Sequence, residues 1–127
     1  MSRHLTSTMS GVIYLTVLLA FIGSIPNAAA VPICGQCLAS QVTLVAPIQL
    51  MTKPTVKMLA NTAAGCKRMN VVCTMPRAGM MEFNRATAGP YEGKTITALL
   101  TCGADKKWRN SYNGKVTIVN AVACYYV

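Results

Sequence analysis

Short runs of alternating hydrophobic and polar residues cover most of the chain beyond residue 40, with turn residues between them. Seven such runs are Gln41–Ala46, Thr55–Ala60, Lys67–Cys73, Gly79–Asn84, Lys94–Cys102, Lys107–Tyr112 and Lys115–Cys124. In the fifth run, Ile96, Ala98 and Leu100 fall on one side of the expected strand. The last two runs flank Asn113-Gly114, a strong signal for a two-residue hairpin turn. The pattern predicts an all-β sandwich of about seven short strands, without a long helix.

The first thirty residues differ from the rest of the chain. A short N-terminal segment with a positive charge precedes the uncharged apolar run Gly11–Ile25, and small residues follow up to Ala30. This is the arrangement of a secretory signal peptide with a cleavage site at Ala28–Ala30. Because the apolar run is shorter than the roughly 20 residues of a membrane-spanning helix, a cleaved signal peptide (1–30) fits better than a retained anchor. No later stretch is long enough to span a membrane, so the sequence predicts a secreted, extracellular single domain, 31–127.

Six cysteines lie in this expected mature domain, and Cys34 and Cys37 form a C-x-x-C motif. A redox site of this kind follows a strand and opens a helix, and neither pattern surrounds the motif. A zinc site needs four ligands, usually from two paired motifs, and His4 is removed with the signal peptide. A domain this small buries only about 60–65% of its unfolded surface, so covalent links are valuable. We therefore predict three disulfides among Cys34, Cys37, Cys66, Cys73, Cys102 and Cys124, with no metal and no cofactor.

The pairing of these cysteines is much less determined, because six cysteines allow 15 arrangements. Cys34 and Cys37 are too close in an extended segment to pair comfortably with each other. Cys73 and Cys102 each end a well-patterned strand, so we predict a bridge between them across facing sheets. The remaining pairings stay open.

Several short motifs accompany the cysteines in a characteristic order. They are CGQC at Cys34–Cys37, GC at Gly65-Cys66, VVC ending at Cys73, EFN at Glu82–Asn84, ITALLTC ending at Cys102, KKW ending at Trp108 and VNAVAC ending at Cys124. Together they resemble the nematode C6 domain, a six-cysteine extracellular module of uncharacterised function. The resemblance covers residues 34–124 and implies a disulfide-stapled β fold and secretion, without catalytic residues. One departure is Arg85, where a glycine commonly follows the FN pair.

Few side chains in the mature domain could carry out catalysis. It has no histidine, and its acids are Glu82, Glu92 and Asp105. A Ser-His-Asp or Cys-His arrangement is therefore impossible within it. Glu82 and Glu92 are read as solvated surface carboxylates, and three scattered acids do not make a calcium loop. The sequence predicts a protein that is not an enzyme.

Positive charge is the most informative remaining feature. The chain has a formal net charge of +9, and removal of Arg3 with the signal peptide leaves +8. Lys106, Lys107 and Arg109 surround Trp108, which predicts a patch for an anionic ligand, with Trp108 as either a platform or a core residue. The expected partner is an anionic glycan or an extracellular protein, since nucleic acid does not fit the compartment. The alternative is a cationic host-defence or membrane-active protein, which needs an exposed apolar face beside the cations.

Overall fold

Eight strands and two short 3₁₀ turns make up the computed structural model, which describes residues 30–127 apart from the side chains of residues 88, 90 and 91. The strands are β1 (Thr43–Leu44), β2 (Met51–Thr52), β3 (Thr55–Met58), β4 (Arg68–Phe83), β5 (Thr87–Cys102), β6 (Trp108–Tyr112), β7 (Lys115–Ile118) and β8 (Ala121–Tyr126). The turns are η1 (Ile33–Gly35) and η2 (Ala39–Gln41), and no helix in 30–127 could cross a bilayer. The expected signal peptide, residues 1–30, lies outside the described residues except for Ala30.

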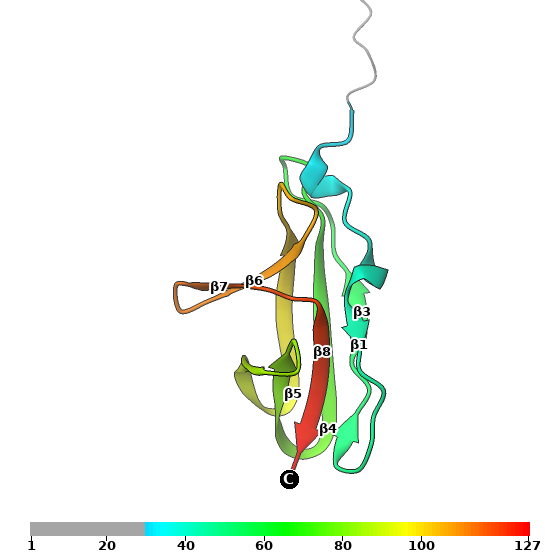
Figure 1. The fold of residues 1–127 in the computed structure, drawn as a ribbon, viewed down its shortest axis with the longest axis vertical. Helices are drawn as coiled ribbons and strands as arrows, with labels where there is room; N and C mark the ends of the chain where they lie inside the picture. The colour runs from blue at the N-terminus through cyan, green and yellow to red at the C-terminus, as the bar shows by residue number, and fades with distance from the viewer. Residues whose placement is uncertain (1–29) are drawn as a thin grey trace, which may run out of the picture. The chain divides into compact units, whose positions relative to one another are not determined.

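A long hairpin of β4 and β5 organises the domain. Both strands have 16 residues, and they pair from Arg68↔Thr101 to Phe83↔Thr87. The register shifts between Thr74 and Gly79, and again between Met80 and Glu82. Extra residues on one strand bend a hairpin, and here the second half of the hairpin turns back towards the first (Figure 1).

The bend is built from residues that a regular ladder excludes. Pro76 has no backbone N–H, and such a residue within a sheet is confined to edges and bulges. Gly79 lies so close to β8 that a Cβ atom there would sit 2.0 Å from the carbonyl oxygen of Tyr125. A side chain at position 79 would therefore separate β4 from β8.

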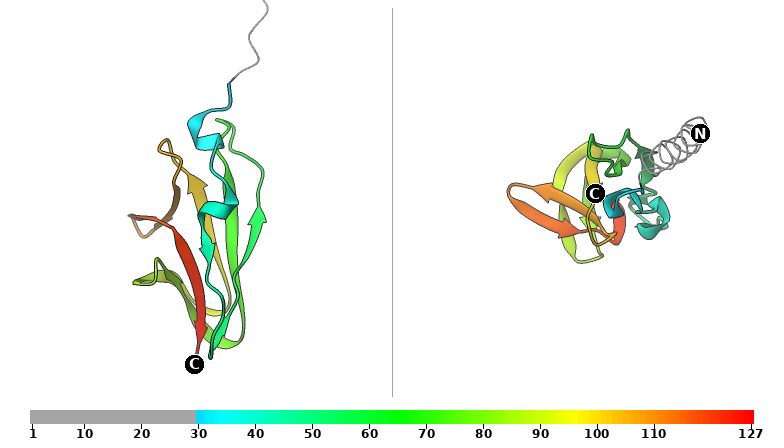
Figure 2. Two further views of the ribbon diagram at one scale, coloured as in Figure 1. Left: turned by 45° about the vertical axis from the view of Figure 1, so that its right-hand side comes forward. Right: turned by 90° about the horizontal axis from the view of Figure 1, so that it is seen from above.

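The two halves of β4 pair with different strands along the hairpin. The first half pairs with β3, and the second half pairs antiparallel with β8, to which β1 and β2 also bind. The full order is β1-β8-β4-β5-β6-β7, with β2 joined to β8 and β3 to β4. The folded sheet thus covers both sides of one core (Figure 2), which confirms the predicted all-β, disulfide-stapled class.

Alternation within each half of β4 places every second residue in the core. Met69, Val71 and Cys73 come from its first half, and Met81 and Phe83 from its second half; each is at most 1% exposed. Because side chains on one face of a strand recur every two residues, both halves of the bent strand contribute to the same cluster.

Several predicted strand boundaries were wrong. Lys67–Cys73 and Gly79–Asn84 were expected to be separate strands but belong to the single strand β4, continuous through the bend. Gln41–Ala46 contains only the two-residue strand β1, because the preceding residues form η2. Lys115–Cys124 divides at Val119–Asn120 into β7 and β8. The expected turn at Asn113-Gly114 is confirmed, with positive φ at both residues.

Three disulfides link Cys34 to Cys66, Cys37 to Cys102 and Cys73 to Cys124. The predicted Cys73–Cys102 bridge is therefore wrong. Cys73 lies opposite Ile96, and Cys102 lies six residues further along the same partner strand, about 20 Å away at strand spacing. Two cysteines so far apart on one hairpin cannot meet, whereas Cys124 of β8 faces Cys73 across the core.

Candidate anionic-ligand surface

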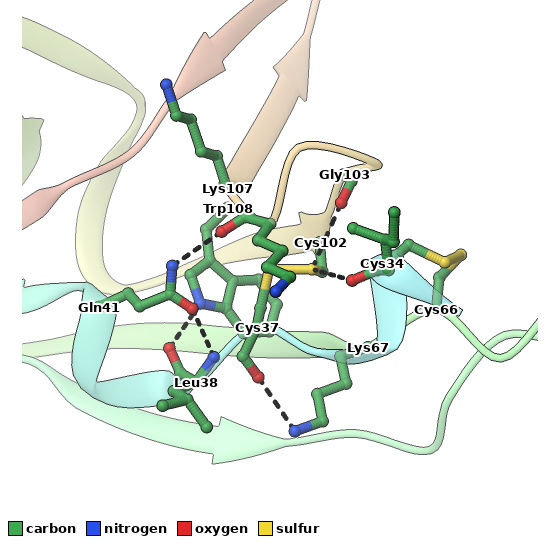
Figure 3. Close-up of a disulfide and its surroundings, with 12 residues drawn as sticks. Cys34, Cys37, Leu38, Gln41, Cys66, Lys67, Cys102, Gly103, Lys107 and Trp108 are labelled. Atoms are coloured by element: carbon green, nitrogen blue, oxygen red, sulfur yellow. Dashed lines mark hydrogen bonds between the residues drawn. A yellow bond between two sulfur atoms is a disulfide. The ribbon is translucent and has the colours of Figure 1, made fainter. Parts of the chain in front are cut away.

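The predicted cationic patch lies at the turn from β5 to β6, which is closed by its own backbone. The N–H of Gly103 donates to the carbonyl of Lys107 at 2.9 Å, and the N–H of Lys106 donates to the carbonyl of Gly103 at 3.1 Å. The amide Nε2 of Gln41 donates to the carbonyl of Lys106 at 2.8 Å, and the Cys37–Cys102 disulfide fixes the start of the turn (Figure 3). These links hold the turn in one conformation against the N-terminal segment.

Trp108 is a core residue and not a binding platform. Its side chain is 1% exposed, and its indole Nε1 donates to the carbonyl of Leu38 at 2.8 Å (Figure 3). Trp108 pairs with Cys102, and both side chains point into the core because they occupy the same face of neighbouring strands. The part of the predicted patch that used its ring as a surface is therefore wrong.

Arg109 points to the outer side of the sheet and forms an ion pair there. Its Nη1 and Nη2 donate to the two carboxylate oxygens of Asp105, each at 2.6 Å. The Arg109 side chain is the main reason that the pKa of Asp105 is lowered to about 2. Since Asp105 is ionised at neutral pH, it compensates the charge of Arg109 within the turn.

Lys106 and Lys107 are exposed on this turn. Lys67, the residue before β4, lies next to the start of this turn, since the N–H of Cys102 donates to the carbonyl of Lys67 at 2.9 Å. The Lys67 ammonium itself donates to the carbonyl of Cys37 at 3.0 Å (Figure 3). The structure therefore retains part of the predicted patch: Lys106 and Lys107 are exposed on a rigid turn, and Lys67 lies nearby with its ammonium bound to a backbone carbonyl.

Over residues 30–127 as a whole, few acidic side chains compensate the positive charge. This part of the chain contains eleven Lys and Arg residues and three acids. Within it, the structure shows one salt bridge, between Arg109 and Asp105. No three His, Cys, Asp or Glu side chains in the same range gather into a group that could hold a metal ion.

Strand pairing brings together further cations that the sequence analysis did not connect. Arg68, Thr101 and Arg109 form one row across β4, β5 and β6. Lys57 and Asn70 lie in the next row, across β3 and β4. Alternation along each strand gives the face of each residue, but only the register of two pairings, β4 with β5 and β5 with β6, places Arg68 in one row with Arg109.

Comparisons with models of known families, with curated proteins and with solved structures found no match to this chain. The resemblance to the nematode C6 domain stays a prediction that rests on the cysteine order and its accompanying motifs. The three disulfides are typical of extracellular proteins.

Proposed function

We propose that residues 31–127 form a secreted, non-catalytic extracellular module that binds an anionic ligand, with a glycan as the main candidate. The observation that carries the proposal is the excess of eight positive charges in this domain, together with the single ion pair in the described part of the chain. A field of this size attracts polyanions and raises their rate of association. The rigid turn that presents Lys106 and Lys107 lowers the cost of ordering side chains on binding.

Salt-gradient elution from a heparin column tests the proposal. The variant K106Q/K107Q removes the two exposed lysines of the turn, and R85Q/K115Q removes two exposed charges from other turns and strands. Both variants have the same net charge, so non-specific attraction is equal in the two. We expect K106Q/K107Q to elute at clearly lower salt than R85Q/K115Q. Elution of the unchanged protein below physiological salt would instead reduce the charge to a solubility device.

One observation favours a second candidate, a cationic membrane-active protein. Ile33 and Leu38 are 50% and 59% exposed, and both belong to the N-terminal segment that is linked to the turn of Lys106 and Lys107. Apolar side chains beside cations are what binding to an anionic membrane surface requires. Dye leakage from vesicles of anionic phospholipid would support this candidate, and heparin binding without leakage would support the glycan-binding module.

A further inference from the structure

The outer face of the sheet over β3, β4, β5 and β6 carries ordered rows of side chains that are polar except for Val72 and Leu99. One row contains Arg68, Thr101 and Arg109, and the next contains Lys57, Asn70 and Leu99. Two further rows contain Thr55, Val72 and Thr97, and then Thr74 and Thr95. The side chains on the other face of β4 and β5 belong to the core, so the side chains in these rows point outwards.

These rows have a chemistry that differs from an ordinary charged surface. None of their members is acidic, and the nearest acid, Asp105, is held by Arg109. The guanidinium of Arg68 is fixed by donation from Nε and Nη2 to the carbonyl of Ala60, at 3.1 and 3.0 Å. The five threonines and Asn70 offer hydroxyl and amide groups, which both donate and accept hydrogen bonds.

Strand geometry sets the spacing of these groups. Neighbouring strands lie about 4.8 Å apart, so Arg68 and Arg109 are separated by about 10 Å across β5. Residues two apart on one strand are separated by about 7 Å, which is the step from one row to the next. The face is therefore a rigid array of cations and hydroxyls that extends over four strands and ends near the turn of Lys106 and Lys107.

We propose that this outer face, which we call the threonine face, binds a linear sulfated polysaccharide that continues onto the turn of Lys106 and Lys107. The inference rests on the proposed function and names the ligand class and its path. Sulfate groups complement Lys57 and Arg68, and sugar hydroxyls complement the threonines and Asn70. A single small anion would engage only one of these rows, so the array selects for a chain.

Binding of heparin oligosaccharides to the disulfide-bonded protein, expressed as the full chain in a secreting host, tests the inference. The variant K57Q/T97E removes one cation and adds one acid at two exposed positions of the threonine face. The matched control, K115Q/Q49E, makes the same change of charge at exposed positions elsewhere. Affinity for a disaccharide and for a decasaccharide is measured by titration calorimetry.

We expect K57Q/T97E to bind the decasaccharide about tenfold more weakly than the control, and the disaccharide equally well. A second variant, Thr97→Lys, should bind the decasaccharide more tightly, a gain that misfolding cannot produce. Equal decasaccharide affinity of K57Q/T97E and K115Q/Q49E would overturn the threonine face as the site. If K106Q/K107Q still weakened binding in that case, the proposed function would stand; if it did not, both would fail.

Discussion

Replacement of Trp108 by phenylalanine separates a core role from a ligand-binding role. The indole is 1% exposed and donates to the carbonyl of Leu38, so W108F removes a hydrogen bond and leaves space around a smaller ring. The lost bond costs about 1–2 kcal/mol, and the poorer packing about as much again. We expect the free energy of unfolding to fall by about 2–4 kcal/mol, which lowers the Tm of a domain this size by roughly 10–30 °C.

Circular dichroism follows unfolding of W108F in guanidinium chloride, because the substitution removes the one tryptophan of the chain. Val116→Ala is the control: this side chain is 57% exposed on β7, so the change should stay within about 0.5 kcal/mol. Below its melting range, W108F should elute from heparin at the same salt as the unchanged protein. Unchanged stability combined with loss of heparin binding would refute the buried position of Trp108 and restore its ring as a ligand platform.

Four further variants test other parts of the structure. In denaturant titrations, C34A/C66A should lower the free energy of unfolding by about 3–4 kcal/mol. C73A/C124A should lower it by about 5–6 kcal/mol, because this disulfide closes a longer loop and because replacing two fully buried cysteines leaves a void. Arg85 has a φ of 59°, so R85G should raise stability by about 0.5–1 kcal/mol, and a lower Tm would contradict the left-handed turn. D105N should elute from heparin at higher salt, since it releases the charge of Arg109. Because the pKa of Asp105 is lowered to about 2 in the folded protein, its ionised form stabilises the fold above about pH 4, and this contribution is lost as the pH falls through about 2. The Tm of D105N should therefore lack this part of the pH dependence.

Local signals in the sequence predicted what depends on neighbours along the chain. Alternation assigned Ile96, Ala98 and Leu100 to one face, and all three are buried. Asn113-Gly114 predicted its turn, because both residues tolerate positive φ. The continuity of β4 could not be predicted in this way. Its alternation breaks after Met75, and the pairing with β5 stops at Thr74 and resumes only at Gly79, where β8 also pairs with β4.

Disulfide pairing depends on the same long-range information. Cys73 and Cys102 both end well-patterned runs, so each fits a bridge equally well when judged alone. The register of β4 and β5 moves them apart, and the bend of the hairpin brings Cys124 over Cys73 instead. A disulfide between facing layers can be assigned only when the bend of the hairpin is known, and no short sequence motif encodes that bend.

The basic surface shows why charge in a β protein has to be followed across strands. Lys107, Trp108 and Arg109 are adjacent in sequence, yet the first is exposed, the second is buried and the third is paired with Asp105 on the outer face. The period of two in a strand separates such neighbours by necessity. The same period, with the register of β4, β5 and β6, places the distant Arg68 in one row with Arg109. A polyanion that contacts the sheet meets that row and the neighbouring rows of Lys57 and Thr97, and not the sequence run. For this reason substitutions at Lys57 and Thr97 test the site more sharply than further changes around Trp108.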